Sequence, residues 1–214
     1  MNGRSPVISI IDDDASYLSA VSRLLRVAGH TVQTFSSAQQ FLDQMTDSPG
    51  CVVVDLRMEG LSGLDLQVTL AEHAYACPII FLSGEGDITS TVRAMRQGAE
   101  DFLTKDAPKE DLLNAVERAL ARDALQRAQR LHLQELRDRF ATLTPREFEV
   151  LQHVMCGQLN KQIAADLEIT ERTVKLHRTA ITTKLRVRSV TELTRLVQEA
   201  HMPEIFGPTL PKGK

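Results

Sequence analysis

The sequence predicts an α/β first half with a doubly wound parallel sheet, followed by an all-α second half. Two observations support the first part. Short β-branched and aromatic runs recur at regular spacing up to residue 104, and segments of helical periodicity lie between them. A third observation supports the second part, because residues 109–202 carry helical periodicity and helix-capping residues.

The first half is expected to alternate strand and helix. Strands are predicted at 7–11, 31–35, 51–55, 78–82 and 101–104, and helices at 16–28, from 36 onward, at 64–71, 89–97 and 109–120. Leu18, Val21 and Leu25 follow a helical period, and Ser36 with Gln39 is typical of a capping box. Because parallel strands need helical crossovers, this order indicates a five-stranded sheet with helices on both faces.

The composition is that of a globular protein. Of the 214 residues, 43% are hydrophobic and 25% are charged, which argues against a wholly disordered chain. No apolar run approaches the roughly 18 residues that cross a bilayer, so no membrane partner is expected. With no secretory signal at the N-terminus and only three scattered cysteines (Cys51, Cys77 and Cys156), we expect a cytoplasmic protein with reduced thiols.

Charge is distributed unevenly along the chain. Residues 1–108 hold 7 Lys and Arg against 14 Asp and Glu. From Arg172 to Arg188 there are six basic residues and no acidic one. This polarity indicates two modules with different partners, a cation for the first and a polyanion for the second.

Reactive side chains gather where the predicted strands end. Asp12 and Asp13 follow the first strand, Asp55 ends the third, Ser83 follows the fourth and Lys105 follows the fifth. Ligands of such sheets bind beyond the carboxyl ends of the strands. If the first and third strands are neighbours, three carboxylates converge, and Mg²⁺ would relieve their repulsion. Asp55 could then attack a phosphoryl group while Lys105 and Ser83 stabilise its oxygens.

The segments IIDDD (10–14), VVVDLRM (52–58), FLSGEGD (81–87) and AEDFLTKD (99–106) resemble the receiver domain of two-component response regulators. The resemblance covers residues 6–121 and implies a flavodoxin-like fold. It implies these roles: phosphoacceptor Asp55; Mg²⁺ ligands Asp12, Asp13, Asp55 and the backbone carbonyl of Arg57; switch residues Ser83 and Phe102; and phosphoryl-stabilising Lys105. The chain departs from the family at Glu59 and Asp106, where proline is common.

The same resemblance implies a two-state switch. A phosphoryl group on Asp55 draws Ser83 inward through a charge-assisted hydrogen bond, and Phe102 moves into the vacated space. The fourth helix, fifth strand and fifth helix then present a changed surface. The implied partners are a sensor histidine kinase, which donates the phosphoryl group, and a second copy of the chain when phosphorylated.

The second half is expected to contain a helical linker at 122–140 and a four-helix domain at 141–202, after a first domain at 1–121. The Pro/Gly-rich tail at 203–214 is expected to be disordered. Thr144 with Glu147 indicates the start of the first helix of the domain. Asn160, Thr170 and Ser189 are expected to cap the next three helices.

The third of these helices has two distinct faces. Val174, Ile181 and Leu185 repeat at the spacing of a buried stripe. Another face carries basic and hydroxyl side chains: Lys175, Arg178, Thr179, Thr182 and Arg186. Such a face suits the major groove of DNA, because cations contact phosphates and guanine edges while hydroxyls contact any base. The alternative is a solvated basic face with no partner.

The segments LTPREFEVLQHVMCGQLNKQIAADLEITERTVKLHRTAITTKL (143–185) and VRSVTELTRLV (187–197) resemble the LuxR-type DNA-binding domain. The resemblance implies double-stranded promoter DNA as ligand and the fourth helix as a dimer element. It assigns Lys175, Leu176 and Thr179 to base edges, and it assigns to phosphates Arg172, Arg178 and Lys184. Together the two resemblances imply a response regulator transcription factor of the NarL/FixJ class, not an enzyme, with RNA polymerase as a further partner.

Two alternatives stay open at this point. The run Asp12-Asp13-Asp14-Ala15-Ser16 also fits the opening of haloacid-dehalogenase-type phosphatases, with Asp12 as nucleophile and Asp14 as acid/base. That hypothesis leaves the DNA-binding half without a function. The second alternative is a regulator that binds DNA regardless of phosphorylation.

Overall fold

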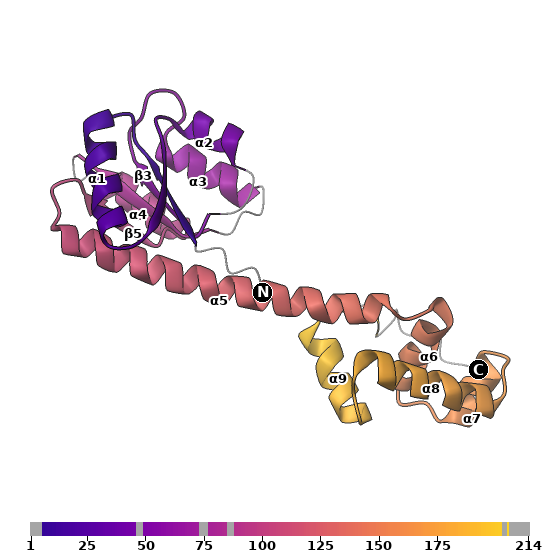
Figure 1. Cartoon of the computed structure of the whole chain (residues 1–214). Helices are drawn as coiled ribbons and strands as arrows, with labels where there is room; N and C mark the ends of the chain where they lie inside the picture. Colours follow the sequence, from indigo (N-terminus) through magenta and orange to yellow (C-terminus); the bar gives the residue numbers. More distant parts are fainter. Residues whose placement is uncertain (1–5, 46–48, 73–76, 85–87, 203–204, 206–214) are drawn as a thin grey trace. The chain divides into compact units, whose positions relative to one another are not determined.

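The computed structural model describes residues 6–45, 49–72, 77–84, 88–202 and 205. The chain divides into two compact units, Met1–Arg127 and Ala128–Lys214 (Figure 1). The elements of the first unit are β1 (Val7–Ile11), α1 (Ala15–Val27), β2 (Thr31–Phe35), α2 (Ala38–Gln44), β3 (Cys51–Asp55), α3 (Gly63–Glu72), β4 (Ile79–Ser83), α4 (Ile88–Arg96), β5 (Asp101–Thr104) and the start of α5 (Lys109–Ala141).

The strands form one parallel sheet in the order β2-β1-β3-β4-β5. This order confirms the predicted five-stranded, doubly wound α/β fold. The strand order reverses between β1 and β3, because β1 has β2 on one side and β3 on the other. A crevice at the carboxyl ends of these two strands is where such a sheet binds its ligand.

Each face of the sheet is covered by its own helices (Figure 1). On one face, Ile8, Val53 and Ile80 pack with α1 and α5, and on the other, Val54 and Phe81 pack with α2, α3 and α4. The central strands β3 and β4 are buried along their whole length. Burial on both faces explains why these strands are continuous apolar runs.

Helix capping confirms most of the expected starts and shifts two of the expected caps by one residue. Asp14 caps α1 by accepting the backbone N–H groups of Ser16 and Tyr17. Helix α2 begins one residue later than expected, because Ser37 accepts the N–H of Gln40 and is the N-cap. Ser36 instead donates its own N–H to the Gln40 side chain, so the predicted Ser36 cap is wrong by one position.

The second unit contains the end of α5 and α6 (Pro145–Met155), α7 (Asn160–Asp166), α8 (Glu171–Leu185) and α9 (Val190–Glu199). Thr144 and Glu147 form the predicted capping box of α6. Helix α7 begins at Asn160 with Leu159 as N-cap, so the predicted Asn160 cap is also wrong by one residue. The core joins these four helices to Leu136 and Phe140 from the end of α5.

Three further predictions concern the C-terminal tail, the thiols and membrane-spanning helices. Ile205 differs from the predicted disordered tail, because its side chain is fully buried in the core of the second unit. The rest of 203–214 lies outside the described residues. Cys51, Cys77 and Cys156 are free cysteines, and among the described helices none is long and apolar enough to cross a bilayer.

Candidate phosphoryl site and nucleic-acid interface

The sheet brings the predicted acidic residues together at one edge. Strands β1 and β3 are paired with Ile11 opposite Val54, so the residues that follow, Asp12 and Asp55, lie side by side. Carboxylate oxygens of Asp12, Asp13 and Asp55 all lie within 4.8 Å of one another. Asp12 and Asp55 are buried, whereas Asp13 faces solvent.

Lys105 enters this cluster from the loop after β5. Its ammonium Nζ lies 2.8 Å from Oδ2 of Asp12 and 2.9 Å from Oδ2 of Asp55. Its backbone N–H donates to the carbonyl oxygen of Ser83, which fixes the loop against the end of β4. Lys105 therefore pairs with two of the three clustered carboxylates, Asp12 and Asp55.

The protonation equilibria reflect this crowding. Burial raises the pKa of Asp12, and the hydrogen bond and charge of Lys105 oppose that shift. Burial alone would lower the pKa of Lys105, but its hydrogen bonds to Asp12 and Asp55 outweigh this and raise the pKa. Lys105 therefore stays charged at neutral pH and holds Asp12 and Asp55 together.

The loop after β3 positions the acidic residues further. The backbone N–H of Arg57 donates to Oδ1 of Asp55 at 3.3 Å, and that of Glu59 donates to Oδ2 of Asp13 at 3.3 Å. Gly63 begins α3 directly against Asp55, and a Cβ at Gly63 would lie 2.5 Å from the Asp55 carbonyl oxygen. Only glycine allows this close approach, which the sequence motifs did not indicate.

The two predicted switch residues lie beside this cluster. Ser83 ends β4 and is 1% exposed. Phe102 lies opposite Phe81 on the adjacent strand, half-buried, with ring centroids 6.2 Å apart and an interplanar angle of 27°. Both side chains are therefore on the strands that follow Asp55 in the sheet.

Sequence patterns missed one neighbour of the site. Tyr17, in the first turn of α1, lies with its ring centroid 4.7 Å from Nζ of Lys105. Tyr17 lies four residues before Val21, so the helical period places the two on one face of α1 but does not indicate a contact with Lys105. The register of α1 against β5 cannot be obtained from periodicity alone.

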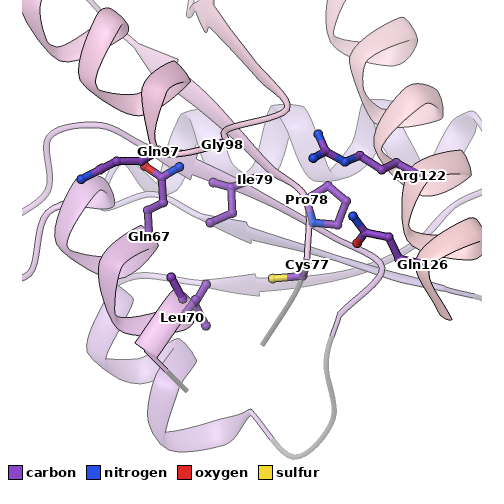
Figure 2. A pocket seen from close by; sticks show the side chains of 10 residues that line it. Gln67, Leu70, Cys77, Pro78, Ile79, Gln97, Gly98, Arg122 and Gln126 are labelled. Atoms are coloured by element: carbon purple, nitrogen blue, oxygen red, sulfur yellow. The ribbon is translucent and has the colours of Figure 1, made fainter. Parts of the chain in front are cut away.

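A separate pocket of about 420 Å³ opens where β4 begins, away from the acidic cluster at the end of the strand (Figure 2). Leu70, Pro78 and Ile79 supply apolar walls, and glutamines from α3, from the turn after α4 and from α5 surround them. The charged residue in its lining, Arg122, is paired with Glu100 at 2.9 Å. Among the described residues that line this pocket, none is a carboxylate that could take up a phosphoryl group.

The second unit presents a candidate DNA-binding face on α8. Val174, Ile181 and Leu185 are buried, as the predicted stripe requires. Arg172, Lys175, Leu176 and Thr179 are exposed on another face of the helix, with Leu176 64% exposed.

Two of the predicted phosphate contacts are engaged within the domain. Arg178 donates to Oδ1 of Asn160 at 3.1 Å. Lys184 is 2.6 Å from Oε2 of Glu147 and donates to the carbonyl of Thr142 at 3.0 Å. A phosphate contact from Lys184 would have to share or break this pair, which connects α6 to α8. The sequence indicated Glu147 only as a capping residue.

We expect Glu147 to make the second unit sensitive to acid. Its hydrogen bond from Lys184 lowers the pKa of Glu147 below its ordinary value of 4.5. A lowered folded-state pKa means that the stabilisation is present above pH 4.5 and is lost as pH falls through the folded pKa. Glu147→Gln should cost about 1–3 kcal/mol at pH 7 and flatten this dependence in chemical denaturation. Exposed Glu149→Gln is the control, and an unchanged pH profile in Glu147→Gln would contradict the assignment.

The first unit carries an acidic cluster with a lysine, which suits a phosphoryl group, and the second carries a basic face on a helix–turn–helix. Together they define a class of protein, the phosphorylation-controlled transcription factor. The chain belongs to the response regulator family. Residues 8–117 match the family described as response regulator receiver domain, and residues 141–197 match bacterial regulatory proteins of the luxR family. The predicted family and class are confirmed by these matches.

Similar proteins cover both units. The response regulator protein TodT of Pseudomonas putida is 44% identical, over 92% of this chain and 88% of that protein. The transcriptional regulatory protein FixJ of Bradyrhizobium diazoefficiens is 37% identical, over 91% of this chain and 96% of its own length. The solved structure of the response regulator StyR is 42% identical with a TM-score of 0.82, over 92% of this chain and 100% of that one.

Proposed function

We propose that Asp55 is the phosphoacceptor and that its modification controls DNA binding by α8. The convergence of Asp12, Asp13, Asp55 and Lys105 in one cluster carries this proposal. A carboxylate oxygen of Asp55 forms the bond to phosphorus while the bond from phosphorus to the histidine of a sensor kinase breaks. Lys105 already faces Oδ2 of Asp55 and is positioned to neutralise the phosphoryl oxygens.

The donor set fits Mg²⁺. Three carboxylates within 4.8 Å, one of them open to solvent, are the hard oxygen ligands that this ion prefers. Asp12, Asp13, Asp55 and the backbone carbonyl of Arg57 would hold it. When bound, Mg²⁺ supplies charge neutralisation for the phosphoryl oxygens. The haloacid-dehalogenase alternative is disfavoured, because the side chain of Asp14 accepts the N–H groups that cap α1.

Mg²⁺ should stabilise the first unit. At 100 times its dissociation constant, a ligand that binds only the folded state adds about 2.7 kcal/mol, which thermal unfolding detects readily. Asp13→Asn should remove most of this gain, and it should not disturb the core because Asp13 is exposed. Asp43→Asn, on the far end of α2, is the matched control. An equal Mg²⁺ effect in wild type and Asp13→Asn would contradict the ligand assignment.

We propose that Ser83 and Phe102 carry the switch. A phosphoryl group on Asp55 would accept a hydrogen bond from Ser83, and Phe102 would turn inward along Phe81. The half-buried state of Phe102 supports this, because the ring can become either more or less buried. The surface of α4, β5 and α5 would then form a homodimer with a second copy of the chain.

For DNA, we propose that Lys175, Leu176 and Thr179 contact base edges and that Arg172 contacts a phosphate. Their exposure on one face of α8 supports this. Arg178 and Lys184 would reach phosphates only if their contacts to Asn160 and Glu147 yield. In α9, Leu193 and Val197 belong to the core, whereas Val190 is 48% exposed and available to a dimer partner.

The proposal also covers the domain boundaries, the location of the protein and a further partner. We assign residues 1–121 to the receiver, 122–140 to a linker and 141–202 to the DNA-binding domain, supported by the matched ranges 8–117 and 141–197. The protein would act in the cytoplasm as a regulator, not as an enzyme, with RNA polymerase as a further partner.

A binding titration tests this function. The full chain is titrated against genomic DNA fragments with and without acetyl phosphate, and its hydrodynamic size is measured in both states. If the phosphorylated chain binds DNA more tightly and has the size of a dimer, phosphorylation acts through dimerisation. If it binds more tightly as a monomer, phosphorylation instead releases α8 from a state in which it is masked. Equal binding in both states would favour the alternative, a regulator that is independent of phosphorylation.

A further inference from the structure

Tyr17 contacts both ends of Lys105. Its ring centroid lies 4.7 Å from Nζ, and its hydroxyl donates to the Lys105 carbonyl oxygen at 3.5 Å. That same ammonium lies 2.8 Å and 2.9 Å from Asp12 and Asp55. Tyr17, Asp12 and Asp55 therefore all contact the same lysine side chain.

The N-terminal cap of α1 fixes the backbone of Tyr17. Its backbone N–H donates to the Asp14 side chain at 3.1 Å, so the cap that begins α1 also fixes Tyr17. On the same helix, Val21 and Leu25 are buried against the sheet. The ring therefore belongs to α1, whereas the Lys105 ammonium that it contacts belongs to the loop after β5.

Lys105 needs such support. A lysine side chain loses considerable rotamer freedom when its ammonium is held in one place. A crevice of about 180 Å³ is lined by Lys105 together with Tyr17, Leu103, Thr104 and Lys109 among others, and Asp12 and Asp55 are not part of its lining. Without the phenol ring this crevice would enlarge, and Lys105 could turn into it.

We propose that Tyr17 is a positioning residue that holds Lys105 against Asp12 and Asp55 and so sets the rate at which Asp55 accepts a phosphoryl group. This inference rests on the proposed function of Asp55. The ring does most of the holding, because 3.5 Å is long for a hydroxyl–carbonyl hydrogen bond whereas 4.7 Å is within cation–π range.

The first test uses the full chain, Mg²⁺ and acetyl phosphate, so that no kinase surface takes part. Tyr17→Leu should be phosphorylated about five- to tenfold more slowly than wild type, and Tyr17→Phe within about twofold of it. Val27→Ala, on the exposed end of α1, is the control. Absence of phosphorylation at Asp55 in wild type would reject the proposed function. A normal rate in Tyr17→Leu would reject the positioning role alone.

The second test measures Mg²⁺ affinity calorimetrically without any phosphoryl donor. Because the Lys105 ammonium competes with the cation for Asp12 and Asp55, Lys105→Met should bind Mg²⁺ more tightly, and Tyr17→Leu should do so by about two- to fivefold. Thermal unfolding first establishes that each variant is folded at the temperature used.

A double-mutant cycle then separates positioning from a general packing effect. If Tyr17 acts through Lys105, the double variant Tyr17→Leu/Lys105→Met binds Mg²⁺ no more tightly than Lys105→Met. Additive effects of the two substitutions would overturn the proposal. So would a Tyr17→Leu defect that appears with a histidine kinase as donor but not with acetyl phosphate, since Tyr17 would then be a kinase contact.

Discussion

Asp55→Asn should abolish phosphorylation and leave DNA affinity unchanged when acetyl phosphate is added. The substitution keeps the side chain's shape but removes the nucleophilic carboxylate that faces Lys105. In wild type, phosphorylation should raise affinity for the cognate site by about 5–150-fold, the usual range of coupling between two sites. Electrophoretic mobility shift or fluorescence anisotropy at fixed salt measures both.

Asp43→Asn is the matched control for Asp55→Asn, because it makes the same carboxylate-to-amide change on an exposed residue of α2. It should respond to acetyl phosphate as wild type does. If Asp55→Asn gains affinity to the same extent as wild type, the link between this carboxylate and DNA binding is broken. The phosphorylation-independent regulator would then be the better account.

Lys175→Ala should relax sequence choice, whereas Arg172→Ala should weaken binding to all sequences alike. A lost base contact costs about 1–3 kcal/mol of discrimination at the affected base pair. A lost phosphate contact carries no sequence information and should reduce the slope of log affinity against log salt by about 1. Titrations of cognate and mutated operators at several salt concentrations distinguish the two.

Arg137→Ala controls for loss of a cation in the same unit, because Arg137 is exposed on α5 and not on α8. Its affinity and salt slope should match those of wild type. If Lys175→Ala weakened every operator equally, Lys175 would be a phosphate contact instead. DNA binding that does not depend on salt would contradict phosphate contacts by the basic side chains of α8.

The sequence was sufficient to predict that Asp12, Asp55 and Lys105 meet, because their meeting depends on the topology of the sheet. Asp55 ends a strand and Asp12 and Lys105 directly follow strands, and once the order of the parallel strands is assumed, the ends of these strands must meet. The buried stripe of α8 was predictable for a similar reason, since helical period alone places Val174 and Ile181 on one face.

The errors arise where a side chain has a choice of partners. Asn160 has the right chemistry for a cap, but its Oδ1 accepts from Arg178, and the cap position falls on Leu159. Lys184 pairs with Glu147, which is 37 residues away in the sequence, and Tyr17 contacts Lys105, which is 88 residues away in the sequence. Such contacts depend on how helices are rotated against their neighbours, and periodicity does not determine this.

The most direct measurement is to locate the phosphoryl group. The full chain is incubated with Mg²⁺ and acetyl phosphate, the acyl phosphate is trapped by borohydride reduction, and the modified peptide is sequenced by mass spectrometry. Our account predicts modification at Asp55 and none at the other carboxylates of the cluster. Modification of Asp12 would contradict it and would support the phosphatase-type nucleophile.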